Sequence, residues 1–287
     1  GSSSKTVACY CSRYQMAALA LRKLLLLLGV GSALRQHLDA DSWDWFSTVC
    51  SPAEYVGDSF IEATLKLGDG VPPPCWARHL ETAHRLVAQH FRTSLTVDEV
   101  ASIYAYTDDC SEDLNELLLN ATDDAADQRV CSYGWLLIRS MAKLPPYRHG
   151  TVYRGISGID AEVLPQVRAG DVLNWRSFTS TSVHRSVAEI FARRGIGRIF
   201  VITLTSTHAR LVGDFTENPS EQEVLLPPGT QVMVERVERL LPSDESSIEE
   251  VVHVRELETA SPINLAWLQQ YEDGDRQHKH RHRHRPF

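Results

Sequence analysis

Two glutamates one residue apart, Glu221 and Glu223, are the side chains of this chain best suited to chemistry. On an extended chain, residues two apart point to the same side and lie about 6–7 Å from each other. Two carboxylates that face one cleft repel, which raises the pKa of one of them and suits it to accept a proton. A Glu-x-Glu pair alone more often marks a solvated edge strand. Its chemistry therefore depends on which other residues the fold brings beside it.

A second candidate is Arg154, which ends a β-rich run and is followed by Gly155. A glycine lets the backbone come close to a ligand. The arginine side chain presents a planar fork of donors that suits a diphosphate. A strand-end arginine by itself is more often part of a surface ion pair, so this signal also needs support from its surroundings.

The third candidate is Ser180, within the run Ser-Phe-Thr-Ser-Thr-Ser at residues 177–182. Strand alternation places Phe178, Ser180 and Ser182 on one face and the two threonines on the other. A serine that shares a face with a phenylalanine is unusual in a plain core strand, although Ser/Thr pairs across strands are common. No Gly-x-Ser-x-Gly turn surrounds Ser180, so a serine hydrolase is not expected.

The elements that must position these residues change in character along the chain. Helical spacing and a capping-box pattern at Thr96 predict a helix-rich first half. The expected helices cover residues 13–38, 76–92, 113–120 and 127–142, and another begins after Thr96. Short β-rich runs follow, at residues 151–154, 177–182, 199–204, 223–226 and 231–237, with a helix over 186–194. Helices first and strands second predict an α+β fold built on mainly antiparallel sheets.

The best boundary in the first half is the Gly- and Pro-rich stretch at residues 68–74, which no regular element tolerates. We therefore predict an N-terminal helical region over residues 1–70 and a catalytic domain over 71–265. Residues 272–287 are rich in His and Arg and are expected to form a mobile tail. The apolar run at residues 24–28 also fits a signal peptide, but a packed helix is favoured, and no transmembrane segment is expected.

Charge and cysteine spacing exclude two classes of ligand. The formal net charge is -8, and five of the 29 Lys and Arg residues lie in the tail. The remaining acidic body would repel a phosphate backbone, so nucleic acid is not an expected partner. The six cysteines include no pair with the CxxC spacing of a zinc site, so no metal is expected. Disulfides would fit a secreted protein and reduced, buried thiols a cytosolic one; the second interpretation is favoured.

Three motifs in order resemble those of the Arg–Ser–Glu (Glu-x-Glu) class of mono-ADP-ribosyltransferases: Tyr-Arg-Gly at residues 153–155, the run at 177–182, and Glu-Gln-Glu at 221–223. This class includes bacterial toxins and effectors and the arginine-specific vertebrate enzymes. Residues 104–107, 114–115 and 143–145 fit the family's upstream pattern as well. The resemblance implies an α+β fold in which two mainly antiparallel sheets enclose a cleft for NAD⁺. The NAD⁺ would be a consumed substrate, with no permanently bound cofactor.

The resemblance also implies a role for each residue. Arg154 holds NAD⁺, and the backbone at Gly155 recognises the nicotinamide amide. Ser180 orients the catalytic glutamate and the nicotinamide ribose. Loss of nicotinamide leaves an oxocarbenium-like ribose cation, which Glu223 is expected to stabilise. Glu221 then orients and deprotonates the acceptor nitrogen.

Two further features concern recognition. Residues 213–220 occupy the place of the family's substrate-recognition turns, and Phe215 is the candidate there for contact with a target protein, with ordinary packing as the alternative. Many relatives have an arginine closely following the Asn-x-x-Leu step, where it contacts an NAD⁺ phosphate. In this chain the step at residues 115–118 is followed by Leu119. The contact is therefore either missing or supplied from elsewhere, with Arg129 and Arg139 as candidates.

The resemblance implies an enzyme that transfers ADP-ribose from NAD⁺ to a side chain of a target protein, usually an arginine, and releases nicotinamide. A secreted toxin or effector acting in a host cytosol is the favoured setting. Three alternatives stay open: another acceptor such as threonine, hydrolysis of NAD⁺ by water, and a catalytically dead binding module. The Gly-Val-Gly at residues 29–31 lacks the third glycine of a dinucleotide fingerprint, so a Rossmann site is not expected.

Overall fold

The structure is a computed structural model. It describes residues 46, 50, 57–68, 70, 78–90, 94–108, 111–120, 129–148, 150–158, 166–193, 196–240 and 248–257. The predicted helix at 13–38 and the predicted tail at 272–287 lie outside these ranges. Within the described residues, a helical half precedes a β-rich half, as the sequence predicts.

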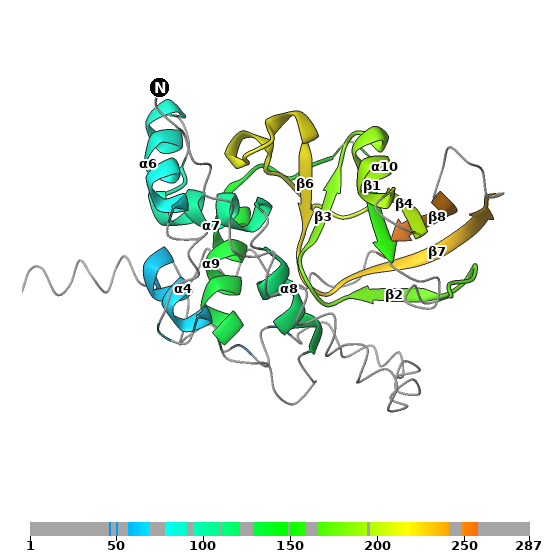
Figure 1. The fold of residues 1–287 in the computed structure, drawn as a ribbon, viewed down its shortest axis with the longest axis horizontal. Helices are drawn as coiled ribbons and strands as arrows, with labels where there is room; N and C mark the ends of the chain where they lie inside the picture. The colour runs from blue at the N-terminus through cyan, green and yellow to red at the C-terminus, as the bar shows by residue number, and fades with distance from the viewer. Residues whose placement is uncertain are drawn as a thin grey trace, which may run out of the picture.

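The helical half contains five α-helices among the described residues: α4 (Phe60–Leu67), α6 (His79–Gln89), α7 (Val97–Thr107), α8 (Ser111–Asn120) and α9 (Arg129–Lys143). The β-rich half contains β1 (Thr151–Gly158), β2 (Val172–Trp175), β3 (Thr179–Ser182), α10 (Arg185–Ala192), β4 (Ile196–Thr203), β5 (Arg210–Leu211), the 3₁₀ turns η3 (Gly213–Phe215) and η4 (Pro219–Glu221), β6 (Glu223–Leu226), β7 (Thr230–Arg239) and β8 (Ile248–Glu256). Figure 1 shows the five helices on one side and most of the strands, with α10, on the other.

The predicted capping box at the start of α7 is confirmed. The Thr96 side chain accepts a hydrogen bond from the backbone N–H of Glu99, and the Glu99 carboxylate accepts from the Thr96 backbone N–H at 2.7 Å. These bonds satisfy backbone donors that a helix start leaves free. The buried Glu99 carboxylate also accepts from Lys143 Nζ at 2.6 Å. The start of α7 is thereby fixed to the end of α9.

The eight strands form one hydrogen-bonded sheet in the order β2-β7-β8-β4-β1-β3-β6-β5. The mainly antiparallel arrangement is confirmed, since β4 and β8 are the only parallel neighbours among the described strands. The number of sheets differs from the expected two. β1 and β3 are joined through one register pair, Tyr153 with Ser182, so the sheet is close to dividing into a five-stranded and a three-stranded part.

Strand β6 lies between two hydrophobic clusters. Leu225 belongs to a cluster that also contains the buried residues of α4, α7 and α9, together with Phe178. Its neighbours Val224 and Leu226 belong to a second cluster with residues of β1, β4, β7 and β8. Because interiors are close-packed, a strand buried on both faces has little freedom to shift. Any side chain at the start of β6 is therefore held by a rigid support.

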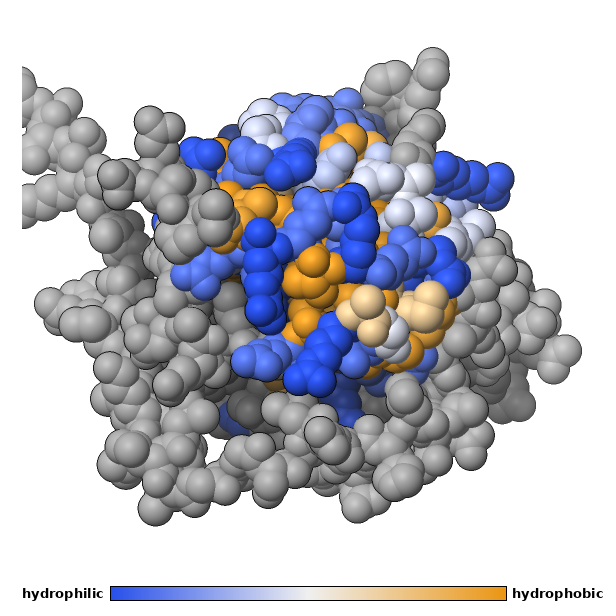
Figure 2. All heavy atoms as spheres, turned by 90° about the vertical axis from the view of Figure 1, so that its right-hand side faces the viewer, coloured by the Kyte–Doolittle hydropathy of each residue, from blue (hydrophilic) through white to orange (hydrophobic). Residues whose placement is uncertain are grey.

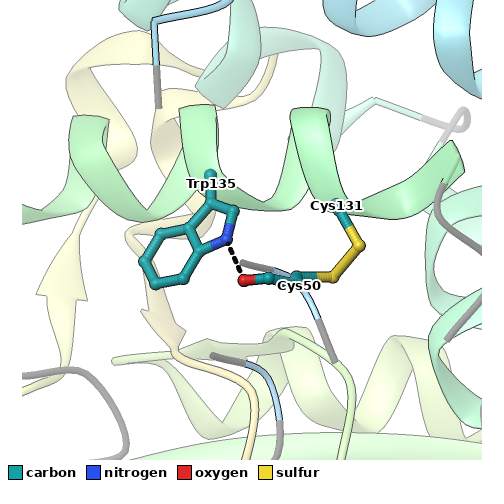
Figure 3. The surroundings of a disulfide bond; sticks show 3 residues. All are labelled: Cys50, Cys131 and Trp135. Atoms are coloured by element: carbon teal, nitrogen blue, oxygen red, sulfur yellow. Dashed lines mark hydrogen bonds between the residues drawn. A yellow bond between two sulfur atoms is a disulfide. The ribbon is translucent and has the colours of Figure 1, made fainter. Parts of the chain in front are cut away.

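A disulfide joins the segment before α4 to α9. Cys50 Sγ and Cys131 Sγ lie 2.00 Å apart, and Trp135 Nε1 donates a hydrogen bond to the Cys50 carbonyl at 2.8 Å (Figure 3). For this pair the favoured interpretation as reduced thiols is wrong. The spacing of cysteines along a chain does not reveal which of them the fold brings together. The other four cysteines, Cys9, Cys11, Cys75 and Cys110, lie outside the described residues.

The surface of the β-rich end mixes hydrophobic side chains with a larger number of hydrophilic ones (Figure 2). Its helix α10 carries two exposed large hydrophobic residues, Ile190 at 60% and Phe191 at 37% exposure. Across the ranges that the structure describes, no helix has the length and apolar character needed to span a membrane.

Candidate active site

The three predicted motifs meet where β1, β3 and β6 adjoin. Ser182 in β3 is the register partner of Glu223 in β6, and Ser180 is the partner of Leu225. Residues opposite each other on antiparallel strands point to the same side, so Ser180, Ser182 and Glu223 share one face of the sheet. The predicted alternation along residues 177–182 is confirmed for these serines. Three segments from distant parts of the sequence thus form one site.

The centre of the site is a hydrogen bond between Ser180 and Glu223. Ser180 Oγ donates to Glu223 Oε1 at 2.5 Å. Glu223 is 6% exposed, and burial raises the pKa of its carboxyl to about 7, with a smaller rise from the negative charge of Glu221. The Ser180 hydrogen bond and the Arg154 charge lower the same pKa. The expectation that one carboxyl of the pair has a raised pKa is confirmed, and burial contributes more to the shift than repulsion does.

Arg154 approaches the same centre from β1. Its Nη1 donates to the backbone carbonyl of Ser180 at 2.9 Å. Burial lowers the pKa of its guanidinium, and the neighbouring Tyr106 and Glu223 act in the opposite direction. Among the described residues, this carbonyl is the one hydrogen-bond partner of the guanidinium, which has five N–H donors. Arg154 therefore holds the Ser180 backbone and keeps donors for an anionic ligand.

Tyr106 and Asn115 belong to the site as well, and their individual roles were not predicted. The buried phenol of Tyr106 donates to the Phe178 carbonyl at 2.9 Å and accepts from Asn115 Nδ2 at 3.1 Å. Burial raises the pKa of the Tyr106 phenol above its usual value, and the charges of Glu223 and Arg154 both act on it. The sequence signal was only that residues 104–107 and 114–115 fit the family pattern. In the structure, helices α7 and α8 are joined through this phenol to the residue that precedes β3.

The extended conformation assumed for residues 221–223 is wrong. Glu221 ends the 3₁₀ turn η4, Gln222 has left-handed backbone angles (φ 45°, ψ 54°), and Glu223 begins β6. A left-handed residue turns the chain, so the same-face argument from strand alternation does not apply here. Glu221 is half-buried, whereas Glu223 is buried. The two carboxylates still interact, because the charge of Glu221 raises the pKa of Glu223.

Gly155 is required by the close packing of α10 on β1. A Cβ at this position would lie 1.8 Å from the backbone carbonyl oxygen of Ala188 in α10. Gly197 in β4, the register partner of Ser157, meets the same helix, with the Ala192 carbonyl oxygen 2.1 Å from its would-be Cβ. Both glycines let α10 pack directly on the sheet. Recognition of the nicotinamide amide at Gly155 stays a prediction.

Phe215 is buried, as the alternative of ordinary packing predicts. The ring is 6% exposed, belongs to the helical cluster and lies 5.3 Å from the His90 ring between centroids. The turn η3 folds this part of the loop inward, which buries a large apolar side chain. Most of the exposed residues of the loop are polar, among them Glu217 and Asn218. Contact of Phe215 with a target protein stays a prediction.

One of the two candidates for the missing phosphate contact is Arg139, which lies beside a buried carboxylate. Its Nε lies 3.2 Å from the buried Glu99 Oε1. Arg129 begins α9 and is half-buried. Leu119, which follows the Asn-x-x-Leu step, is 56% exposed. The described residues contain no cluster of His, Cys, Asp and Glu that could hold a metal ion.

Comparison with known proteins agrees with this geometry. A model of the family "NAD:arginine ADP-ribosyltransferase" matches residues 76–249, which is more than half of the chain. The Mycobacterium avium (strain 104) protein "Putative NAD(+)--arginine ADP-ribosyltransferase Mav" is 34% identical over 141 residues. That match covers 49% of this chain and 16% of Mav, so the chain spans only a small part of this relative's length.

Solved structures with a similar fold include two bacterial proteins. The Vis toxin of Vibrio splendidus, an ADP-ribosyltransferase, matches with a TM-score of 0.48 and 21% identity, over 66% of this chain and 88% of Vis. The type III effector XopAI of Xanthomonas axonopodis pv. citri matches with a TM-score of 0.48 and 19% identity, over 84% of this chain and 99% of the truncated XopAI. The family assignment depends on the match over residues 76–249, which contains all three motifs. The chain belongs to the NAD:arginine ADP-ribosyltransferase family.

Proposed function

We propose that this chain transfers the ADP-ribose of NAD⁺ to the guanidinium of an arginine on a target protein and releases nicotinamide. The observation that carries the proposal is the buried Ser180–Glu223 hydrogen bond beside Arg154, within a chain of this family. A buried carboxylate with fixed partners is suited to stabilise a cation in a site with little water. A secreted toxin or effector that acts on a host protein is the setting we propose for this activity.

In the proposed reaction, Arg154 binds the diphosphate of NAD⁺ with the donors that Ser180 leaves free. The bond between nicotinamide and C1′ of the ribose breaks, and neutral nicotinamide leaves with the electron pair. The ribose cation that forms lies against the Glu223 carboxylate, which Ser180 Oγ holds in place.

Glu221 is the residue that acts on the acceptor. An acceptor guanidinium attacks C1′ through one nitrogen, and that nitrogen must lose a proton so that the substituted guanidinium keeps its single positive charge. Glu221 is half-buried in a turn at the start of β6, where an incoming side chain can reach it. It hydrogen-bonds the guanidinium and takes this proton, which balances the reaction. Water needs less orientation than a guanidinium, so hydrolysis of NAD⁺ is the expected side reaction.

The test uses purified protein, NAD⁺ labelled in its adenylate part, and a small guanidine such as agmatine. We expect labelled ADP-ribosyl-agmatine and one equivalent of nicotinamide per transfer, measured by chromatography. Omitting agmatine should leave only slow release of nicotinamide with free ADP-ribose. Equal rates of ADP-ribose formation with and without agmatine would identify an NAD⁺ glycohydrolase, and release of no nicotinamide would identify a binding module.

The acceptor type in a protein is tested with a cell lysate as the source of targets. Mass spectrometry of the labelled proteins is expected to place ADP-ribose on arginine side chains. Labelling that is confined to threonine or another residue type would contradict the arginine proposal and leave the transferase proposal standing.

A further inference from the structure

Gln222 has an unusual backbone conformation for its residue type. With φ at 45°, it is the one non-glycine residue with a positive φ among the described residues. The left-handed region is disfavoured for any residue with a Cβ, and asparagine and aspartate are the residue types other than glycine that enter it most readily. Such a conformation persists only where the surroundings fix it, and it occurs most often at functional sites.

The surroundings of Gln222 fix it from two sides. Its backbone N–H donates to the Pro219 carbonyl at 3.2 Å, and its side-chain Nε2 donates to the same oxygen at 3.0 Å. Its own carbonyl accepts from the Val183 N–H at 3.3 Å. The turn is thus closed on itself and is also attached to the segment that follows β3.

The residue before Gln222 is held as firmly. The Glu221 carbonyl accepts from Ser182 Oγ at 2.6 Å, and Ser182 Oγ in turn accepts from the His184 N–H at 2.9 Å. Ser182 is buried and is the register partner of Glu223. One serine of β3 therefore connects the backbone positions of both glutamates.

The left-handed turn gives the two carboxylates different surroundings. Glu223 enters β6 and is buried with Ser180, whereas Glu221 stays half-buried in the turn. If residue 222 were extended, residues 221 to 223 would continue β6 in register opposite β3, and both carboxylates would project from one face. The turn lets one carboxylate act inside the site and the other meet an acceptor at its edge.

We infer that Gln222 is a positioning residue whose left-handed conformation places Glu221 for the acceptor while Glu223 remains against Ser180. The inference rests on the proposed function and deepens it, because it identifies what sets the ratio of transfer to hydrolysis. Gln222 acts through Glu221 and is not itself assigned a contact with substrate.

The test compares substitutions that differ in how well they adopt the left-handed conformation. Gln222→Gly and Gln222→Asn adopt it readily, Gln222→Ala removes the Nε2 bond without a β-branch, and Gln222→Val resists it. Nicotinamide release without acceptor measures hydrolysis, and labelled ADP-ribosyl-agmatine measures transfer. The melting temperature with and without NAD⁺ shows that each variant is folded and binds NAD⁺.

We expect the transfer-to-hydrolysis ratio to stay within about twofold of wild type in the Gly, Asn and Ala variants. In the Val variant we expect the ratio to fall roughly tenfold with hydrolysis retained. An unchanged ratio in a folded Val variant overturns the inference. An equal loss in the Gly and Val variants also overturns it, because the side chain and not the conformation would then matter.

A second variant keeps the test decisive if Gln222→Val does not fold. Ser182→Ala removes the hydrogen bond that holds the Glu221 carbonyl and should lower the same ratio. An unchanged ratio in Ser182→Ala would then overturn the inference. Failure of the proposed function is distinct, because wild-type protein would in that case form no ADP-ribosyl-agmatine at all.

Discussion

Glu223 shows at the scale of one residue how stability and catalysis oppose each other. Burial disfavours its charged form, yet the proposed reaction needs that charge beside the ribose cation. A pKa of about 7 leaves the free enzyme close to half ionised at neutral pH. The positive charge on the nicotinamide ring of bound NAD⁺ favours the ionised form. The substrate therefore helps to create the charge that acts on it.

This ionisation predicts the pH dependence of activity. For NAD⁺ cleavage, kcat/KM reports the free enzyme. We expect it to fall about tenfold per pH unit below the Glu223 pKa of about 7. Glu221→Gln removes a charge that raises this pKa, so the falling limb should move to lower pH. Rates measured between pH 5 and 8 would contradict the assignment if they were flat, or if the limb stayed in place in Glu221→Gln.

The same shift predicts how stability changes with pH. The carboxyl of Glu223 has a higher pKa in the folded protein than its ordinary value of 4.5, so folding is favoured while it is protonated. That contribution is complete below pH 4.5 and is lost as the pH rises to about 7. Glu223→Gln has no such loss and should be more stable than wild type by about 3 kcal/mol at pH 8, with little difference near pH 4.5. Denaturant unfolding at the two pH values measures this, and an equal difference at both would refute the burial explanation.

The two glutamates are predicted to differ in what their removal abolishes. Glu223→Ala should lose both transfer and hydrolysis by at least about a hundredfold, because it removes the group that stabilises the cation. Glu221→Ala should lose transfer to agmatine and keep measurable nicotinamide release, because water needs no carboxylate to orient it. Initial rates of both products in both variants are the measurement. Equal residual transfer in the two variants would contradict the assigned roles.

At the scale of elements, much of the scaffold could be predicted, and the exceptions have physical reasons. The strand at residues 223–226 was placed with the bounds that β6 has, and the capping box of α7 was read from Thr96 and Glu99. The strands β2 and β5 were not predicted; both lie at the edges of the sheet, and the two residues of β5 are too few for a period-two pattern. Strand β8 was not predicted because charged residues such as Glu250 and Glu256 interrupt the apolar pattern of a strand. A partner that stabilises such a charge can lie far away in sequence: Arg198 Nη2 is 2.5 Å from Glu250 Oε2.

The candidate site was predicted better in its composition than in its geometry. Arg154, Ser180 and Glu223 are brought together as expected. The strands that carry the three motifs, β1, β3 and β6, are neighbours in the sheet. The left-handed turn at Gln222 could not be predicted, because glutamine carries no preference for that conformation. Which of the two alternatives holds for Phe215 could not be predicted either, because its burial depends on α6 and α7 packing over the loop.

The packing of α10 on β1 and β4 gives a prediction at this scale. Gly155→Ala places a methyl group where the Ala188 carbonyl oxygen lies, so the helix or the strand must move. We expect a loss of about 2–3 kcal/mol in the free energy of unfolding and weaker NAD⁺ binding, since Arg154 is the adjacent residue. Gly57→Ala is the matched control, because its Cβ would meet nothing within 4 Å. Equal melting temperatures for the two variants would contradict the packing argument.

At the scale of the whole molecule, the core extends upstream of the segment that the family model matches. Phe46, Cys50 and Phe60 precede residue 76, yet all three belong to the helical cluster that also contains Phe215 and Leu225. The described part of residues 1–70 thus packs on the same helices that support β3 and β6. The division into an N-terminal region of 1–70 and a catalytic domain of 71–265 stays a prediction. For the described residues, the two sides of that boundary share one core.

The disulfide connects this upstream segment to the centre of the molecule, and its removal tests how much the connection contributes. Cys50 and Cys131 are 81 residues apart, and Phe46 and Trp135, next to them, have ring centroids 5.3 Å apart. A cross-link over a loop of that length stabilises by about 4 kcal/mol through the unfolded state. We expect a reductant, or the double substitution of both cysteines by alanine, to lower Tm by roughly 10 °C. The double variant should not respond further to reductant, which separates this bond from any other cysteine chemistry.

NAD⁺ should still raise Tm in both cases, because Arg154, Ser180 and Glu223 lie on the sheet, away from the disulfide. A wild-type Tm that does not change under reductant would mean that the two thiols are not joined in the protein. The segment before α4 would then be held by the packing of Phe46 and by the Trp135 hydrogen bond to the Cys50 carbonyl.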